Sequence, residues 1–218
     1  MLITLARKEL RELLPLVILG VILELYLVCT ATGMRLGFFE QNSIGVIPFV
    51  SDETSQLFFY VSGGVGFALA LWQTMLEATR GTFQFLLHRP LERTAIFGTK
   101  LVVGATACLF VAVLPVLCYA LWAEAPGTHA SPFQWSMTAW AWQLCLQMPL
   151  VYFGAFLSGL RPGRWFGSRF LPLAASVAAL SAFQSLSAWP WATLLACLAA
   201  EAAFVLVILY VGRSRDFS

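Results

Sequence analysis

Long apolar blocks constrain this chain more than any other feature of its sequence. Six segments approach the ~20 apolar residues that a helix needs to cross about 30 Å of hydrocarbon. They run from about 13 to 32, 57 to 76, 101 to 122, 137 to 160, 170 to 188 and 191 to 211. Only 11% of the 218 residues are charged, against roughly 25% in soluble domains. We therefore expect an all-α, polytopic membrane protein with one transmembrane domain over residues 13 to 212.

The basic residues give the orientation of these spans independently of hydropathy, because lysine and arginine collect in the loops that stay inside the cell. With six spans, only Arg35 of the 13 basic residues falls on the outer side. The other 12 are Arg7, Lys8, Arg11, Arg80, Arg89, Arg93, Lys100, Arg161, Arg164, Arg169, Arg213 and Arg215. This pattern predicts that both termini, including the tail 213 to 218, lie in the cytoplasm. It also predicts a multi-pass protein of the plasma membrane.

Residues 1 to 12 precede the first span and have helical periodicity of their own. Thr4, Arg7, Lys8 and Arg11 recur on one face, and apolar residues occupy the opposite stripe. The pattern predicts an amphipathic helix that lies along the inner leaflet. Pro15 is tolerated in the first turn of the spanning helix that follows. The alternative is a polar flank on a longer first span.

The sequence offers no constellation for enzymatic chemistry. Its two histidines, His88 and His129, fall on opposite sides of the predicted membrane, and no Cys/His spacing is typical of a zinc site. No Gly-x-x-x-x-Gly-Lys-Ser/Thr run occurs, so we expect no ATP hydrolysis by the chain itself. The formal charge of +2 is too small for a nucleic-acid-binding patch. We expect neither a metal nor a cofactor on this chain.

Several polar side chains fall within the predicted spans, where an ionised group costs about 2.5 to 3.5 kcal/mol or more. They are Glu24, Gln73, Gln143, Gln147, Gln184 and Glu201. Such residues either line a transport pathway or hold helices together through hydrogen bonds worth about 0.6 to 2 kcal/mol each. Packing between helices is the favoured interpretation, and a pathway is the alternative.

The inner loop from 77 to 100 has the pattern of a structured cytoplasmic element. Gly81 can interrupt a helix and Thr82 can cap the next one. The two helical turns that follow Thr82 would end at Pro90. The basic residues Arg80, Arg89 and Arg93 flank this short amphipathic segment. The loop is therefore a candidate docking element, and the alternative is a basic loop that only lies against the membrane surface.

At this loop the chain resembles the permeases of type-2 ATP-binding-cassette (ABC) exporters. Their pattern is a Glu at the end of the second span, then Gly-Thr, a Leu-Leu pair, a Pro, a nearby Arg, and Gly-x-Lys before the third span. The matching residues here are Glu77, Arg80, Gly81, Thr82, Leu86, Leu87, Pro90, Arg93, Gly98 and Lys100, with Arg89 beside the Pro.

The resemblance implies that residues 77 to 100 carry a coupling helix that fits a groove in a separate ATP-binding subunit. Two permease chains, identical or related, would then pair with two such subunits, which bind the ATP and Mg²⁺. Glu77 and Arg80 would form the hinge that transmits the push of ATP-driven closure. The expected function is that of an export permease in a bacterial inner membrane. The alternative is a non-transporting membrane scaffold that recruits a cytoplasmic partner through the same loop.

Overall fold

A computed structural model describes residues 2–33, 47–50, 53–80, 92–128, 132–161, 168–185 and 190–214. Within these ranges the chain forms helices and no strand, which confirms the all-α prediction. The long helices are α1 (Leu2–Ala31), α2 (Glu53–Arg80), α4 (Arg93–Glu124), α5 (Ala139–Leu160), α6 (Leu171–Ser185) and α7 (Pro190–Ser214). The short 3-10 helices η1 (Trp135–Thr138) and η2 (Ser168–Phe170) precede α5 and α6.

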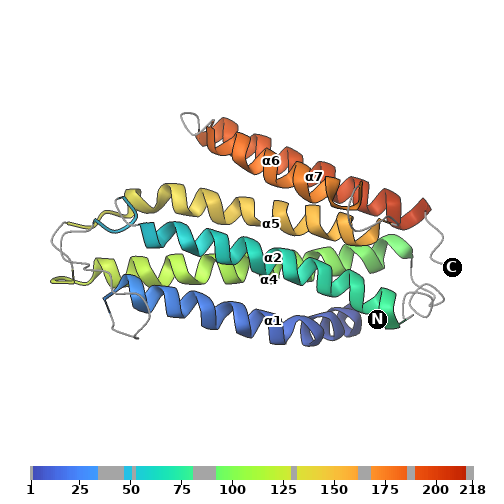
Figure 1. The fold of residues 1–218 in the computed structure, drawn as a ribbon, viewed down its shortest axis with the longest axis horizontal. Helices are drawn as coiled ribbons and strands as arrows, with labels where there is room; N and C mark the ends of the chain where they lie inside the picture. The colour runs from blue at the N-terminus through green and yellow to red at the C-terminus, as the bar shows by residue number, and fades with distance from the viewer. Residues whose placement is uncertain are drawn as a thin grey trace.

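The six long helices run back and forth along one direction, so that α1 begins and α7 ends at the same end of the bundle (Figure 1). We call this the terminal end, and the opposite one the far end. The end of α2 and the start of α4 also lie at the terminal end, as do the end of α5 and the start of α6. Basic residues at the helix ends, such as Arg93, Arg161 and Arg213, are thereby brought together there.

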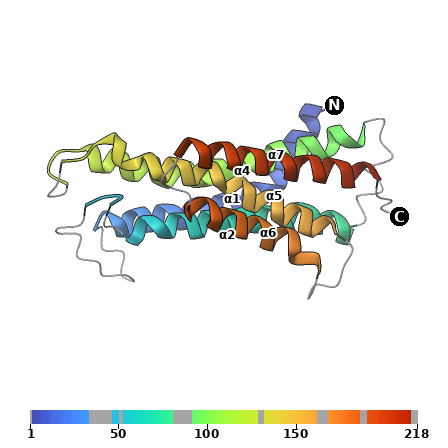
Figure 2. The same cartoon turned by 90° about the horizontal axis from the view of Figure 1, so that it is seen from above.

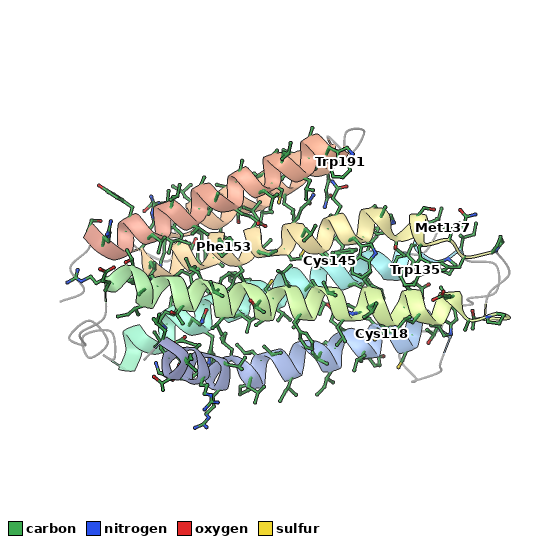
Figure 3. The ribbon with its side chains drawn as sticks, turned by 180° about the vertical axis from the view of Figure 1, so that it is seen from behind. Cys118, Trp135, Met137, Cys145, Phe153 and Trp191 are labelled. Carbon is green, nitrogen blue, oxygen red and sulfur yellow. The ribbon has the colours of Figure 1, made fainter. Side chains whose placement is uncertain are left out.

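Helix α5 is the centre of the bundle and packs against α2, α4, α6 and α7. Viewed from above, α1, α2 and α6 form one layer, and α4 and α7 lie in the other (Figure 2). Close approach requires glycine on α5, because a Cβ at Gly154 would overlap Ser176 of α6 and one at Gly159 would overlap Thr74 of α2. The hairpin of α6 and α7 is tilted, and it diverges from α5 toward Trp191 at the far end (Figure 3).

Helix α1 joins the predicted interfacial segment and the first predicted span into one helix of 30 residues. Pro15 lies inside it. Proline removes one backbone hydrogen bond and bends a helix without having to end it. The first turns accordingly point away from the line of the rest of α1 (Figure 2). The chain thus has one bent helix here, and the placement of its first turns along the inner leaflet stays a prediction.

Within the part of the chain that the structure describes, five helical segments are long and apolar enough to cross a membrane: α1, α2, α4, η1 with α5, and α7. Helix α6 has 15 residues, which at 1.5 Å per residue span about 22 Å of the ~30 Å hydrocarbon core. The rest of the span predicted at 170 to 188 includes residues outside the described ranges. In contrast, α4 has 32 residues and is about 48 Å long, so that several turns extend beyond a bilayer core.

Candidate functional site

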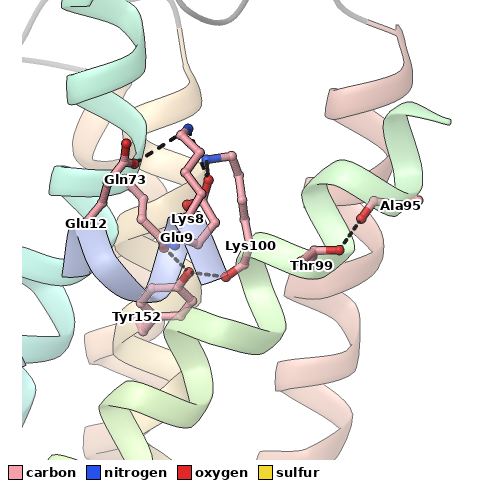
Figure 4. A network of polar contacts seen from close by, with 8 residues as sticks. All are labelled: Lys8, Glu9, Glu12, Gln73, Ala95, Thr99, Lys100 and Tyr152. Atoms are coloured by element: carbon pink, nitrogen blue, oxygen red, sulfur yellow. Dashed lines mark hydrogen bonds and ion pairs between the residues drawn. The ribbon is translucent and has the colours of Figure 1, made fainter. Parts of the chain in front are cut away.

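The terminal end of the bundle contains a buried ion pair. The ammonium of Lys100 on α4 lies 2.9 Å from Oε1 of Glu9 on α1, with 1% and 0% of the two side chains exposed. Gln73 on α2 donates from Nε2 to Oε2 of Glu9 at 3.2 Å. The hydroxyl of Tyr152 on α5 donates to Oε1 of Gln73 at 2.5 Å. These four residues, which we call the Glu9 centre, connect four helices, and the Tyr152 hydroxyl also lies 3.2 Å from the Lys100 carbonyl (Figure 4).

Helical spacing and one glycine place the members of the Glu9 centre. Leu5, Glu9 and Leu13 are all buried, because residues four apart share one face of α1. The Tyr152 ring fits between α5 and α4 because Gly104 has no side chain, and a Cβ there would overlap the Tyr152 hydroxyl. The Glu9 carboxylate is therefore directed into the bundle and held there from two sides.

A second cation borders the Glu9 centre on its exposed side. Lys8 Nζ lies 3.6 Å from Oε1 of Glu9 and 3.6 Å from Oε2 of Glu12, and 39% of the Lys8 side chain is exposed. The buried pair is thus continuous with a surface ion pair on the first turns of α1 (Figure 4). Removing one partner of a buried pair costs about 3 to 5 kcal/mol, whereas exposed pairs contribute about 0 to 1 kcal/mol.

The Glu9 centre contacts both helices that flank the link between α2 and α4. Gln73 lies about two turns before α2 ends at Arg80, and Lys100 about two turns after α4 begins at Arg93. A displacement of the link would move these two helix ends. Because both side chains bind the same carboxylate, such a movement would act directly on α1.

The residues predicted for the coupling loop fall into four groups. Glu77 and Arg80 are in the last turn of α2, and their side chains lie outside the described part of the chain. Arg93 begins α4 and donates from Nη1 to the Arg213 carbonyl at the end of α7 at 3.4 Å. Lys100, predicted as part of the loop, is inside the bundle. The remaining predicted residues are outside the described ranges: Gly81, Thr82, Leu86, Leu87, Arg89 and Pro90.

The two carboxyl groups predicted within spans lie apart from the Glu9 centre. Glu24 on α1 is fully buried and accepts a hydrogen bond from Ser62 of α2 at 2.7 Å, while its Oε2 has no hydrogen-bond partner. Glu201 on α7 is half-buried and lies 3.8 Å from the thiol of Cys197 on the same helix. Neither carboxyl group is paired with a cation among the ion pairs of the described residues.

A cavity of about 590 Å³ lies between α2, α5 and α6, toward the far end of the bundle. Four glutamines line it, one each from α2 and α6 and two from α5: Gln56, Gln184, Gln143 and Gln147. Three of them belong to the set of polar residues predicted within spans, which the structure thus brings together at one site. Gln73, the remaining glutamine of that set, belongs to the Glu9 centre instead.

Sequence reasoning missed Glu9, Tyr152 and Gln56. A carboxylate four residues from an apolar residue on either side, as Glu9 is from Leu5 and Leu13, was the available signal for a buried acidic group. Tyr152 and Gln56 carry no comparable signal, since their roles depend on which helices are neighbours. Among the described residues, no group of three or more His, Cys, Asp or Glu side chains has a geometry that would hold a metal ion.

Comparison of the chain with protein-family models, with curated proteins and with solved structures found no match.

Proposed function

We propose that this chain is the membrane permease subunit of an ATP-driven exporter of the ABC type. It spans the inner membrane of a bacterium six times, with both termini in the cytoplasm. Two permease chains, identical or related, pair with two copies of a separate ATP-binding subunit, which supplies ATP and Mg²⁺ chemistry. The chain itself is not an enzyme. Its task is to convert movement of the ATPases into a change of access along the membrane.

The observation that carries this proposal is the Glu9 centre. A permease needs a mechanical connection between the loop that an ATPase pushes and the helices that enclose the pathway. Gln73 and Lys100 sit on the two helices that the loop joins, and both bind Glu9 on α1. Tyr152 extends the connection to the central helix α5. A push on the segment between Arg80 and Arg93 would thus reach all four helices.

The length of α4 supports the same proposal. Its 32 residues extend about 18 Å beyond a ~30 Å hydrocarbon core. The terminal end of α4 begins with Arg93, which also contacts the end of α7. A helix that projects from the bilayer with a basic residue at its tip is suited to contact a cytoplasmic protein. Six helices run back and forth along one direction, five of which are long and apolar enough to cross a membrane, and this arrangement supports six spans with the termini on one side.

The test uses the full chain co-expressed with a candidate ABC ATPase from the same genome. Arg93→Glu should abolish co-purification, because it reverses the charge at the proposed contact. Arg161→Glu is the matched control, since Arg161 is an exposed arginine at the same end of the bundle. The double variant Glu9→Gln with Lys100→Met, which leaves no unpaired ion inside the bundle, should leave co-purification intact but abolish the stimulation of ATP hydrolysis by the permease in proteoliposomes.

Two results would refute the proposal. One is co-purification that neither Arg93→Glu nor deletion of residues 82 to 89 reduces. The other is a wild-type complex whose ATP hydrolysis is independent of the permease chain. If the chain still co-purifies with the ATPase but ATP hydrolysis does not depend on it, the alternative is favoured, a scaffold that only recruits its partner.

A further inference from the structure

The cavity between α2, α5 and α6 opens sideways on the bundle. Its floor is on α5, where Gln147 and Met148 are 1% and 2% exposed. Its rim is on α2 and α6, where Tyr60 is 73% and Val177 46% exposed. Direct packing connects α2 to α5 and α6 to α5, so α5 forms the bottom of a groove between the other two helices. In a membrane, this mouth faces the bilayer.

The polar groups of the cavity lead from the rim to the floor. Gln56 and Gln184 are exposed and lie near the far ends of α2 and α6, and Gln143 and Gln147 follow on successive turns of α5. Gln147 is eight residues from the start of α5, which corresponds to about 12 Å along the helix axis. The amides therefore form a polar track from the membrane surface into an apolar environment.

Gln147 has an unsatisfied hydrogen-bond acceptor. Its side chain is buried, and its Oε1 has no hydrogen-bond partner. Leaving a buried polar atom unpaired costs about 1 to 3 kcal/mol. Gln147 also lines the cavity, so a bound molecule that donates a hydrogen bond would remove this cost. The floor of the cavity is thus prepared for a hydroxyl or an N–H group.

One wall of the cavity is held in place by the segment at residues 47 to 50. Phe49 has φ of 64°, a left-handed conformation that is strained for a residue other than glycine. Its carbonyl accepts a hydrogen bond from Trp140 Nε1 at 2.9 Å, and the Trp140 ring lies 5.5 Å from that of Phe59. Trp140 and Phe59 both line the cavity. The apolar wall therefore exists before any ligand binds.

None of the lining residues of this cavity carries a formal charge. A charged group bound there would lack an opposite charge and would be costly to remove from water. The volume of about 590 Å³ lies within the range of about 300 to 1,000 Å³ typical of small-molecule sites. Because the mouth faces the bilayer, the molecules that reach it are those that dissolve in the membrane.

From these features we propose that the cavity binds an uncharged amphipathic molecule whose polar group donates a hydrogen bond to Gln147. Its apolar part extends along Phe59, Trp140 and Val177 into the bilayer. Diacylglycerols and long-chain alcohols or amides belong to this class. The site depends on the placement of the bundle in a membrane and does not depend on the proposed ATPase.

The test is photolabelling of the full chain, without an ATPase, in phosphatidylcholine vesicles. Three diazirine probes with identical acyl chains are compared: a diacylglycerol, its O-methyl ether, and a phosphatidic acid. The diacylglycerol should label the peptide that contains Met148. The ether, which lacks the donor, should label it about five- to tenfold less, as expected for the loss of one hydrogen bond. Phosphatidic acid should label it no better than the ether.

Two neighbouring glycines give a matched pair of variants. A Cβ at Gly63 meets only the Met148 sulfur, at 4.0 Å, and Gly63 lines the cavity. A Cβ at Gly64 meets nothing within 4 Å, and Gly64 is exposed. Gly63→Leu should therefore fill the cavity and abolish labelling at Met148, whereas Gly64→Leu should retain it. Both changes raise helix propensity to the same extent.

Gln147→Leu separates binding from folding. It should reduce diacylglycerol labelling about five- to tenfold, yet it should not lower the thermal stability of the ligand-free protein, because it removes an unsatisfied buried atom. Gln134→Leu is the control, since Gln134 is exposed and precedes η1. Equal labelling by all three probes, or equal labelling of the Gly63→Leu and Gly64→Leu variants, would overturn the proposal. Either result leaves the co-purification test of the permease unaffected, so the two proposals can fail separately.

Discussion

The buried pair of Glu9 and Lys100 can be tested by a double-mutant cycle. Lys100→Met removes the ammonium but leaves the Glu9 carboxylate inside the bundle, where 0% of its side chain is exposed. Loss of one partner of a buried pair costs about 3 to 5 kcal/mol. Lys8, 3.6 Å from the same carboxylate oxygen, can compensate in part. We therefore expect Lys100→Met to lower the free energy of unfolding by about 3 kcal/mol.

The double variant should recover most of this loss. Glu9→Gln with Lys100→Met leaves no ion in the centre and retains an amide that can bond to Gln73. Replacing a complete buried pair with neutral side chains is often nearly neutral, so we expect a net loss of about 1 kcal/mol and a coupling energy of at least ~2 kcal/mol between the two positions. Adding Lys8→Gln to Lys100→Met should deepen the loss of the single variant.

Unfolding by sodium dodecyl sulfate in mixed micelles, followed by tryptophan fluorescence, measures these differences. The chain has eight tryptophans, and Trp122, Trp140 and Trp142 are partly buried against its core. A control is Arg7→Gln, which removes a charge from an exposed position of the same helix. Single-variant losses below about 1 kcal/mol that simply add in the double variant would refute a buried, tightly coupled pair.

Three further outcomes follow from the fold. Gly104→Ala should destabilise the protein by about 2 to 3 kcal/mol, because the added Cβ would displace the Tyr152 hydroxyl. The control is Gly98→Ala, whose Cβ meets nothing within 4 Å and which should be neutral in the same unfolding assay. Glu24→Gln should change stability by less than about 1 kcal/mol, because the amide oxygen can still accept the hydrogen bond from Ser62. A complete loss of transport in a stable Glu24→Gln variant would instead assign this carboxyl group a role in the pathway. In intact cells, a membrane-impermeant maleimide should label a cysteine placed at Ala125 but not one at Ser214, since these residues lie at opposite ends of the bundle, and equal labelling of both would refute an even number of spans.

The sequence predicts helix type and position well wherever a segment is apolar over its whole length. It is less informative at Pro15, where the same residue is compatible with a new helix or with a bend in one continuous helix. The structure has the bend. Local hydrophobicity does not distinguish the two cases, because the buried stripe of Leu5, Glu9 and Leu13 is defined by contacts with α2 and α4.

The polar residues show the same limit. Their spacing on α5 predicts that Gln143 and Gln147 share a face, and both line the cavity. Spacing does not show that Gln73 binds Glu9. Nor does it show that Lys100, which the motif assigns to the loop, is the counter-ion of a buried carboxylate. The two residues of these pairs are 64 and 91 positions apart in the chain. Their contact depends on the register between packed helices, which no local pattern of a single sequence encodes.

The central position of α5 has a consequence for biosynthesis. This helix carries Gln143 and Gln147, and with η1 it is the candidate span most covered by other helices. Two of its neighbours, α6 and α7, are synthesised after it. When α5 leaves the ribosome, its glutamines would face lipid unless α2 and α4 already shelter one side. Insertion of α5 should therefore be cooperative with the preceding helices, and truncation before α6 should leave a chain that the cell's quality control recognises as unfinished.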